Sequence, residues 1–207
     1  MPVNLRGKPI QATAILLGII ALISIICFLS FYLWASNLDS SLSRLFLSDS
    51  RVPVHITVFG RSSDTNEANT ISARIDFFTS SGESLGNVER SWAGWELKID
   101  CIVIGAKKGY LAFPFLAYTD ETKRGSGVDL LRSYDRFGFP AIYESGKLTK
   151  DERNSLKRLF GLVGTEKWVP GILGSLRHET VSIRSFEAGK EYSLFISHDG
   201  ALSLRGN

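Results

Sequence analysis

Hydrophobic residues follow two main patterns along this chain. The run from Pro9 to Leu38 contains no Asp, Glu, Lys or Arg, and it is longer than the roughly 20 helical residues that cross a hydrocarbon core. Beyond it, apolar and polar residues often alternate with a period of two, which is typical of half-buried strands. The pattern predicts one N-terminal transmembrane helix followed by an α+β, mainly β domain.

Alternation defines the strands expected in the first half of that domain. Two of them have the predicted buried faces Val52, Val54, Ile56 and Val58, and Ile71, Ala73, Ile75 and Phe77. A third strand is expected to turn Glu96, Lys98 and Asp100 toward solvent. The next segment, 109–120, is apolar on both faces, and Pro114 lacks an N–H, which places that strand at a sheet edge or a bulge.

One or two helices are expected in the second half. Thr149 and Glu152 have the spacing of a capping box. They precede an apolar stripe that Gly161 or Gly164 can end, formed by Leu156, Leu159, Phe160 and Val163. A weaker helical pattern lies in 125–138, with Ser126 as a possible cap and with Val128, Leu131 and Tyr134 on the buried side.

The C-terminal segment predicts the last strands. Asp199-Gly200 is a signal for a two-residue hairpin turn between two of them. The expected architecture is therefore a sandwich-like pair of antiparallel sheets with one or two packed helices.

The chain divides into four predicted parts: a short cytoplasmic tail (1–11), a transmembrane anchor (12–35), a juxtamembrane stalk (36–51) and a β-rich extracytoplasmic domain (52–207). The anchor is expected to stay uncleaved, because Trp34 is too bulky for the small-residue pattern of a cleavage site.

Flanking charges bear on the orientation of this anchor. Arg6 and Lys8 on one side are matched by Arg44 and Arg51 on the other, so the count is tied. The first pair and the terminal amine lie closer to the helix. We therefore expect a cytoplasmic N-terminus and a folded domain in the cell envelope or periplasm.

Composition narrows the class of partner. The part of the chain after the anchor contains 22 of the 24 basic residues and all 21 acidic residues. Its formal charge is therefore 22 minus 21, or +1. This balance does not predict nucleic-acid binding. Of the two cysteines, Cys27 lies in the apolar run, which leaves Cys101 without an intramolecular partner. No disulfide framework is expected, so stability must come from a packed core.

The segment GESLG at 82–86 matches the nucleophile-elbow pattern Gly-x-Ser-x-Gly, with Ser84 at its centre. His178 and His198 could complete a serine hydrolase. An elbow, however, needs a helix directly after the serine, and the following residues carry no apolar stripe at helical spacing. We interpret GESLG as a turn between strands and keep the anchored hydrolase as the alternative hypothesis.

The remaining chemistry-bearing residues predict neither a metal site nor a cofactor. The three histidines are isolated in sequence, and none has a second ligand at a helical or loop spacing. No phosphate-cradling glycine loop precedes a helix.

Aromatic residues are dense between residues 92 and 143. They indicate either an aromatic core or an exposed recognition groove, and burial of large rings favours the core. The best place for a groove is the irregular segment around Gly138 and Pro140. Its Phe137, Phe139 and Tyr143 are the candidate binding residues.

The anchor offers a second interaction surface. Ala14 and Gly18 form a small-xxx-small pair, with Ala21 close to the same face, which suits self-association or a partner helix. The sequence therefore predicts a single-pass envelope protein that binds, scaffolds or helps assemble a protein partner without catalysis.

Overall fold

The computed structural model describes residues 8–42, 51–62, 69–106, 109–122, 124–167 and 176–206. The chain forms two compact units, Met1–Ser40 and Ser41–Asn207.

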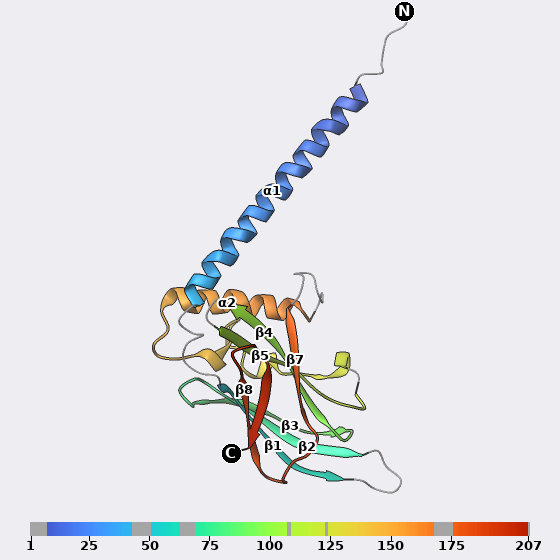
Figure 1. The fold of residues 1–207 in the computed structure, drawn as a ribbon, viewed down its shortest axis with the longest axis vertical. Helices are drawn as coiled ribbons and strands as arrows, with labels where there is room; N and C mark the ends of the chain where they lie inside the picture. The colour runs from blue at the N-terminus through green and yellow to red at the C-terminus, as the bar shows by residue number, and fades with distance from the viewer. Residues whose placement is uncertain are drawn as a thin grey trace, which may run out of the picture. The chain divides into compact units, whose positions relative to one another are not determined.

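The first unit contains most of the helix α1 (Lys8–Leu42), blue in Figure 1. Its segment Thr13–Ser30 is long and apolar enough to cross a membrane. The helix continues beyond the predicted anchor into the predicted stalk, as far as Leu42. The rest of that stalk, 43–50, lies outside the described residues.

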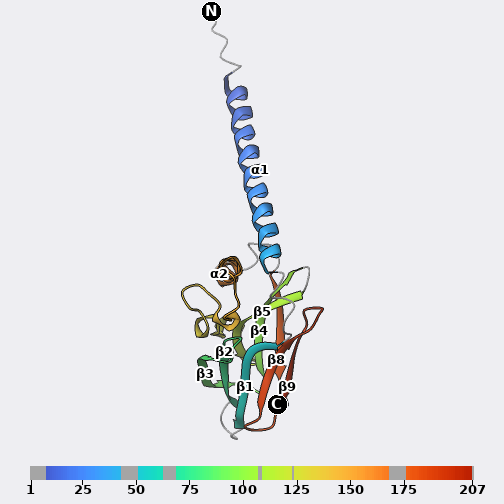
Figure 2. The ribbon, with the colours of Figure 1, turned by 90° about the vertical axis from the view of Figure 1, so that its left-hand side faces the viewer.

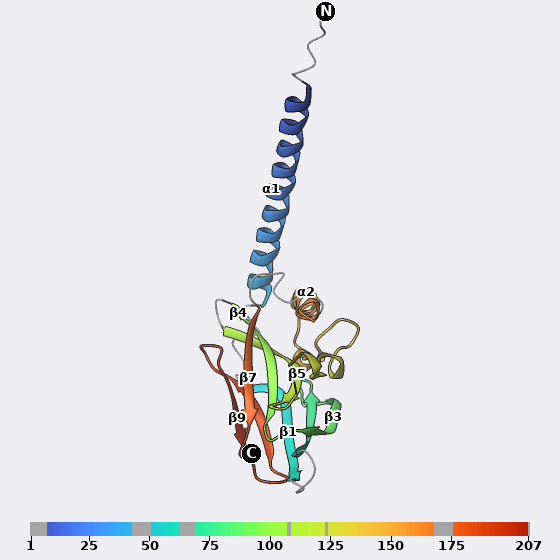
Figure 3. The same cartoon turned by 90° about the vertical axis from the view of Figure 1, so that its right-hand side faces the viewer.

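The second unit is mainly β and contains two antiparallel sheets. The five-stranded sheet has the order β3-β2-β1-β8-β9, seen from left to right in Figure 2. Its strands are β1 (Arg51–Ser62), β2 (Thr70–Phe78), β3 (Ser84–Ala93), β8 (Glu191–Ile196) and β9 (Leu202–Gly206). The four-stranded sheet has the order β6-β5-β4-β7, and Figure 3 shows β4, β5 and β7. Its strands are β4 (Leu97–Ala106), β5 (Gly109–Thr119), β6 (Val128–Asp129) and β7 (Arg177–Ile183).

The alternating apolar residues of β1 and β2 form a continuous buried face, as predicted. Ile56 lies opposite Ile75 in the antiparallel register, and Val54 lies opposite Phe77. All eight predicted core residues of these two strands are buried. The period of two thus identified both strands and the face that they turn inward.

The predicted solvent face of β4 requires a correction. Glu96 and Lys98 are half-buried and form an ion pair, but the Asp100 side chain is fully buried. His178 and Thr180 of the neighbouring strand β7 contact Asp100. This face of β4 is therefore covered, and it does not carry the row of solvated charges that alternation alone predicts.

Pro114 lies at a β-bulge, one of the two predicted positions. Cys101 is paired with Pro114, whereas the preceding Asp100 is paired with Leu116, so Phe115 is the extra residue on β5. A bulge suits proline, which cannot donate to the ladder.

The helix α2 (Lys150–Thr165) begins with the predicted capping box. The hydroxyl of Thr149 accepts from the Glu152 N–H, and the Glu152 carboxylate accepts from the Thr149 N–H at 2.8 Å. The prediction that Gly161 or Gly164 ends the helix is wrong, because α2 continues to Thr165. Val163 is fully buried between them, and its packing holds the last turn in helical form.

The second predicted helix, within 125–138, is wrong. The segment instead forms the 3₁₀ turns η2 (Arg124–Ser126) and η3 (Leu131–Ser133), separated by β6. Val128 and Asp129 pair with β5, and the Asp129 carboxylate accepts from the Leu131 N–H. Strand pairing and this side-chain bond replace helical hydrogen bonds. Leu131 and Tyr134 are nevertheless buried, as expected.

The β8–β9 hairpin also differs from the predicted two-residue turn. Ser197 N–H donates to the Ala201 carbonyl at 2.9 Å, which leaves three residues in the loop. Gly200 has φ of +82°, and the Asp199 carboxylate accepts from the Ala201 N–H. The aspartate side chain therefore supports a longer loop than the Asp-Gly signal indicates.

Candidate functional site

Phe137 lies at the tip of a tight turn. Arg136 and Phe139 exchange backbone hydrogen bonds of 2.9 and 3.1 Å, and an antiparallel bridge joins Asp135 to Pro140 outside them. The two central residues, Phe137 and Gly138, have φ of +57° and +75°. Two consecutive positive φ values are the mark of a type I′ hairpin turn.

A phenylalanine is an unusual residue for this conformation. Left-handed backbone costs an ordinary residue about 1–2 kcal/mol, and Gly, Asn or Asp normally occupies such positions. The Asp135 carboxylate accepts from the Gly138 N–H at 2.7 Å and fixes the turn. The Phe137 side chain is 96% exposed, so it contributes no burial to offset the strain.

The other two predicted binding residues do not share this exposure. Phe139 is only 2% exposed, and the Arg153 guanidinium lies 4.6 Å from its ring centre. The Tyr143 hydroxyl donates to the Ala112 carbonyl and accepts from the Ala112 N–H. The three candidates therefore do not form one exposed groove, and only Phe137 projects from the domain.

Most of the neighbouring aromatic side chains belong to the core. Ring centres 5.4 to 6.2 Å apart link a chain of five residues: Phe77, Tyr134, Phe160, Phe113 and Tyr143. The Tyr134 hydroxyl donates to the Pro114 carbonyl at 2.8 Å. Burial raises the pKa of Tyr134 well above its usual range. These contacts explain the aromatic density of the sequence as core packing.

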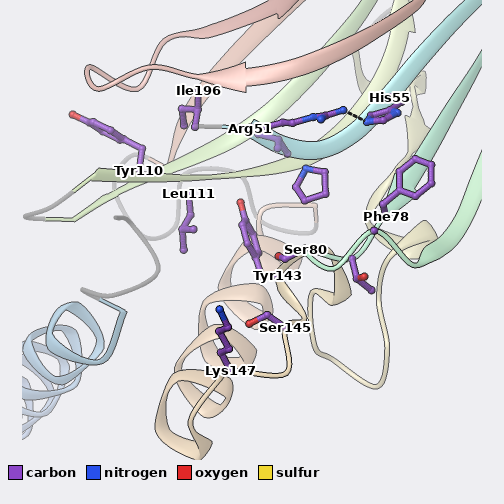
Figure 4. Close-up of a pocket in the computed structure, with 14 residues that line it drawn as sticks. Arg51, His55, Phe78, Ser80, Tyr110, Leu111, Tyr143, Ser145, Lys147 and Ile196 are labelled. Carbon is purple, nitrogen blue, oxygen red and sulfur yellow. Dashed lines mark hydrogen bonds between the residues drawn. The ribbon is translucent and has the colours of Figure 1, made fainter. Parts of the chain in front are cut away.

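A cavity of about 610 Å³ opens beside Tyr143 (Figure 4). Its walls come from the start of β1, the end of β2 and the turn after it, the start of β5, the end of β8, and the segment between η4 (Ala141–Tyr143) and α2. No local sequence pattern identifies this cavity, because these segments are far apart along the chain. Its size is that of a small-molecule site.

Ser84 begins β3 in the β2–β3 hairpin, opposite Phe78. The preceding turn is closed by the Gly82 N–H, which donates to the Thr79 carbonyl, and Gly82 has φ of +88°. The chain after Ser84 is a strand and not a helix. Among the described residues, no hydrogen bond joins the Ser84 hydroxyl to a histidine.

The two histidines considered with Ser84 lie in different surroundings. His178 is in β7, with Nδ1 3.1 Å from Asp100 Oδ2 and Nε2 3.5 Å from Glu166 Oε1. His198 is exposed in the β8–β9 loop. His178 thus lies between the carboxylates of Asp100 and Glu166. The sequence did not predict this arrangement, because the histidine has no acidic partner at a helical or loop spacing.

One signal in the sequence bears on the burial of Asp100. Ile102 and Ile104 follow Asp100 on the same face of β4, so that face becomes apolar beyond the aspartate. An acidic residue beside such an apolar stretch is expected to be covered and partnered. In the part of the chain that the structure describes, no group of three His, Cys, Asp or Glu side chains is placed to hold a metal ion.

The predicted association surface of the anchor lies on α1. Ala14, Gly18 and Ala21 are exposed on this helix, and apart from the adjoining helix backbone and the two chain neighbours no atom lies within 4 Å of a Cβ added at Gly18. Within the first unit, this surface of α1 is uncovered and could pack against a helix of another chain.

No protein-family model, curated protein or solved structure matches the chain. Two geometric features of the β domain are candidates for function: an exposed aromatic side chain on a strained turn, and a cavity.

Proposed function

We propose that this chain is a single-pass membrane protein of the cell envelope whose exported, sandwich-like β domain binds a protein partner without catalysis. The observation that carries the proposal is Phe137, a fully exposed aromatic side chain held in a left-handed conformation. The long apolar segment of α1 supports the anchored part of the proposal.

The strain at Phe137 argues for a role outside the domain. Glycine or asparagine would serve the turn at lower cost, and the exposed ring adds nothing to the core. Backbone strain of this kind is concentrated at sites of function. Aromatic residues dominate the binding energy of protein interfaces, where a few buried anchors carry most of the affinity.

The rigidity of the turn also suits recognition. Both backbone bonds between Arg136 and Phe139 are formed, and the Asp135 carboxylate adds a third. The ring is therefore presented from a fixed backbone, which lowers the entropy lost on binding. The near-zero charge of the domain favours an apolar anchor over electrostatic steering.

Capture from cross-linked membranes tests this function. The full chain is purified as wild type, as Phe137→Asn and as Phe59→Asn, and recovery of co-purified proteins is compared by mass spectrometry. Phe59 is the matched control, because it is an exposed phenylalanine on β1 that does not have a positive φ. We expect Phe137→Asn to reduce recovery of a specific protein at least tenfold and Phe59→Asn to leave it unchanged. Equal recovery with all three chains would contradict the proposal.

Reporter fusions at the C-terminus test the orientation. Alkaline phosphatase fused after residue 207 should be active, and a cytoplasmic fluorescent protein at the same position should be dark. The opposite pair of results would place the domain in the cytoplasm.

A further inference from the structure

The cavity beside Tyr143 carries basic side chains and no acidic ones among the described residues that line it. Arg51 and His55 come from β1, and Lys147 comes from the segment before α2. Figure 4 shows Arg51 on the strand wall and Lys147 on the opposite side of the cavity. Acidic and basic residues are almost equal in number over the exported part of the chain, so the lining departs from the composition of the domain.

His55 positions the Arg51 guanidinium. Glu191 Oε1 lies 2.8 Å from His55 Nδ1, which therefore donates, and His55 Nε2 is left to accept from Arg51. Arg51 Nη2 also donates to the Ser193 hydroxyl at 3.0 Å. Burial lowers the pKa of His55 against the opposing effect of Glu191, which favours the neutral, accepting imidazole.

The described protein supplies no direct ion-pair partner to the two cationic side chains of the cavity, and Glu191 is linked to Arg51 only through His55. Among the described residues, no carboxylate forms an ion pair with Arg51 or Lys147, whereas Arg153 and Lys167 each contact one. A guanidinium has five N–H donors, and only one of the Arg51 nitrogens is engaged. Both side chains therefore keep donors for a ligand.

Two neutral hydroxyl groups of the cavity are engaged within the protein. Ser80 donates to the Ile142 carbonyl at 3.0 Å, and both hydrogen bonds of the Tyr143 hydroxyl go to Ala112. Tyr110 and Ser145, which carry hydroxyls, also line the cavity, and its charged donors are those of Arg51 and Lys147. A ligand whose polar part accepts hydrogen bonds and carries negative charge suits the Arg51 and Lys147 donors.

The cavity also has an apolar surface. Val52, Leu111 and Ile196 line it and are buried in the domain, and the ring of Phe78 lines it beside His55. This surface suits a hydrocarbon chain or ring, which gains free energy on leaving water.

We propose that the cavity binds an amphipathic anion, in which a carboxylate or phosphate group meets Arg51 and Lys147 while an apolar chain or ring lies against Val52, Leu111 and Ile196. The site does not involve Phe137, so its test is independent of the partner-binding proposal.

Calorimetric titration tests this site. The full chain in phosphatidylcholine nanodiscs is titrated with hexyl phosphate, and with 1-hexanol and inorganic phosphate for comparison. We expect saturable binding of hexyl phosphate at one site, at least tenfold tighter than binding of either comparison ligand. Comparable binding of hexanol or of inorganic phosphate would overturn the proposal, because it would remove the need for charge or for the apolar surface.

Three charge-removing variants locate the site. Arg51→Gln and Lys147→Gln should each weaken hexyl phosphate binding at least tenfold. Lys150→Gln is the matched control, since this exposed lysine begins α2 outside the cavity lining, and it should leave the affinity unchanged. Lys147 is exposed, so its variant is expected to fold even where Arg51→Gln does not. Absent binding, or equal weakening by all three variants, would overturn the site.

Nanodiscs containing phosphatidylglycerol identify the source of the ligand. At equal high salt, weaker apparent binding of hexyl phosphate in these discs indicates competition by a bilayer lipid. Unchanged binding indicates a water-soluble amphiphile. Both results support the anion site and differ only in where its natural ligand resides.

Discussion

Nδ1 of His178 on β7 lies 3.1 Å from Oδ2 of Asp100, a fully buried carboxylate on the neighbouring strand β4. The second Asp100 oxygen accepts from the Thr180 hydroxyl at 3.2 Å. A buried carboxylate persists only when hydrogen bonds replace the water that it has lost. The pair thus explains how a buried aspartate is accommodated in the middle of a largely apolar strand.

Replacing Asp100 should destabilise the domain. Asp100→Ala leaves the His178 and Thr180 donors without this acceptor, and we expect the free energy of unfolding to fall by about 1–3 kcal/mol. Glu96→Ala is the control, because its contact with Lys98 is a long ion pair of 3.7 Å, of the kind that contributes about 0–1 kcal/mol. Urea unfolding followed by circular dichroism measures both. Equal stability of Asp100→Ala and wild type would refute this role of the pair.

Phe137 and Phe139 should respond in opposite ways to substitution. Phe137→Asn relieves a strained φ and exposes no core, so stability should stay constant or rise by up to about 1 kcal/mol. Phe139→Ala removes a buried ring and should cost about 3–5 kcal/mol. Thermal and urea unfolding of the two variants separate these effects. Marked destabilisation by Phe137→Asn would show that the turn needs this ring for folding.

Local sequence signals predicted much of this fold. Val54 and Ile56 lie on the predicted buried face, and Thr149 with Glu152 forms the predicted cap, because alternation and capping depend on residues close in sequence. Asp100 was wrongly predicted on the solvent face, because the residues that contact it, His178 and Thr180, come about eighty positions later in the chain. The positive φ of Phe137 likewise depends on how the flanking chain pairs. The cavity could not be predicted, since five separate segments form it.

Alkaline pH should destabilise the domain through its buried tyrosines. Burial raises the pKa of Tyr134 and of Tyr143 above the usual value. In the unfolded chain these phenols lose protons above about pH 10, whereas the folded chain retains them. Stability is therefore complete below about pH 10 and falls above it, by up to about 1.4 kcal/mol per pH unit for each such tyrosine.

Tyr134→Phe tests this linkage. The variant should lose about 1 kcal/mol at neutral pH with its bond to the Pro114 carbonyl, and its stability should fall less steeply above pH 10. Urea unfolding at a series of pH values measures the slope. An unchanged slope in the variant would mean that Tyr134 ionises equally in both states.

Ser84 should not react as a catalytic nucleophile. Its place at the start of a hairpin strand, with no hydrogen bond to a described histidine, offers no base to activate the hydroxyl. A fluorophosphonate probe is therefore expected to leave the full chain unlabelled, with Ser84→Ala as the control. Labelling of the wild type that disappears in Ser84→Ala would favour the anchored hydrolase.

Site-specific photo-cross-linking tests the partner-binding function most directly. Benzoyl-phenylalanine is introduced in intact cells of the source organism in place of Phe137 and, separately, in place of the exposed Phe59. If Phe137 is a recognition anchor, ultraviolet light should produce a discrete protein adduct from position 137 and none of that mass from position 59. The absence of any adduct at position 137, or the same adducts from both positions, would contradict the account.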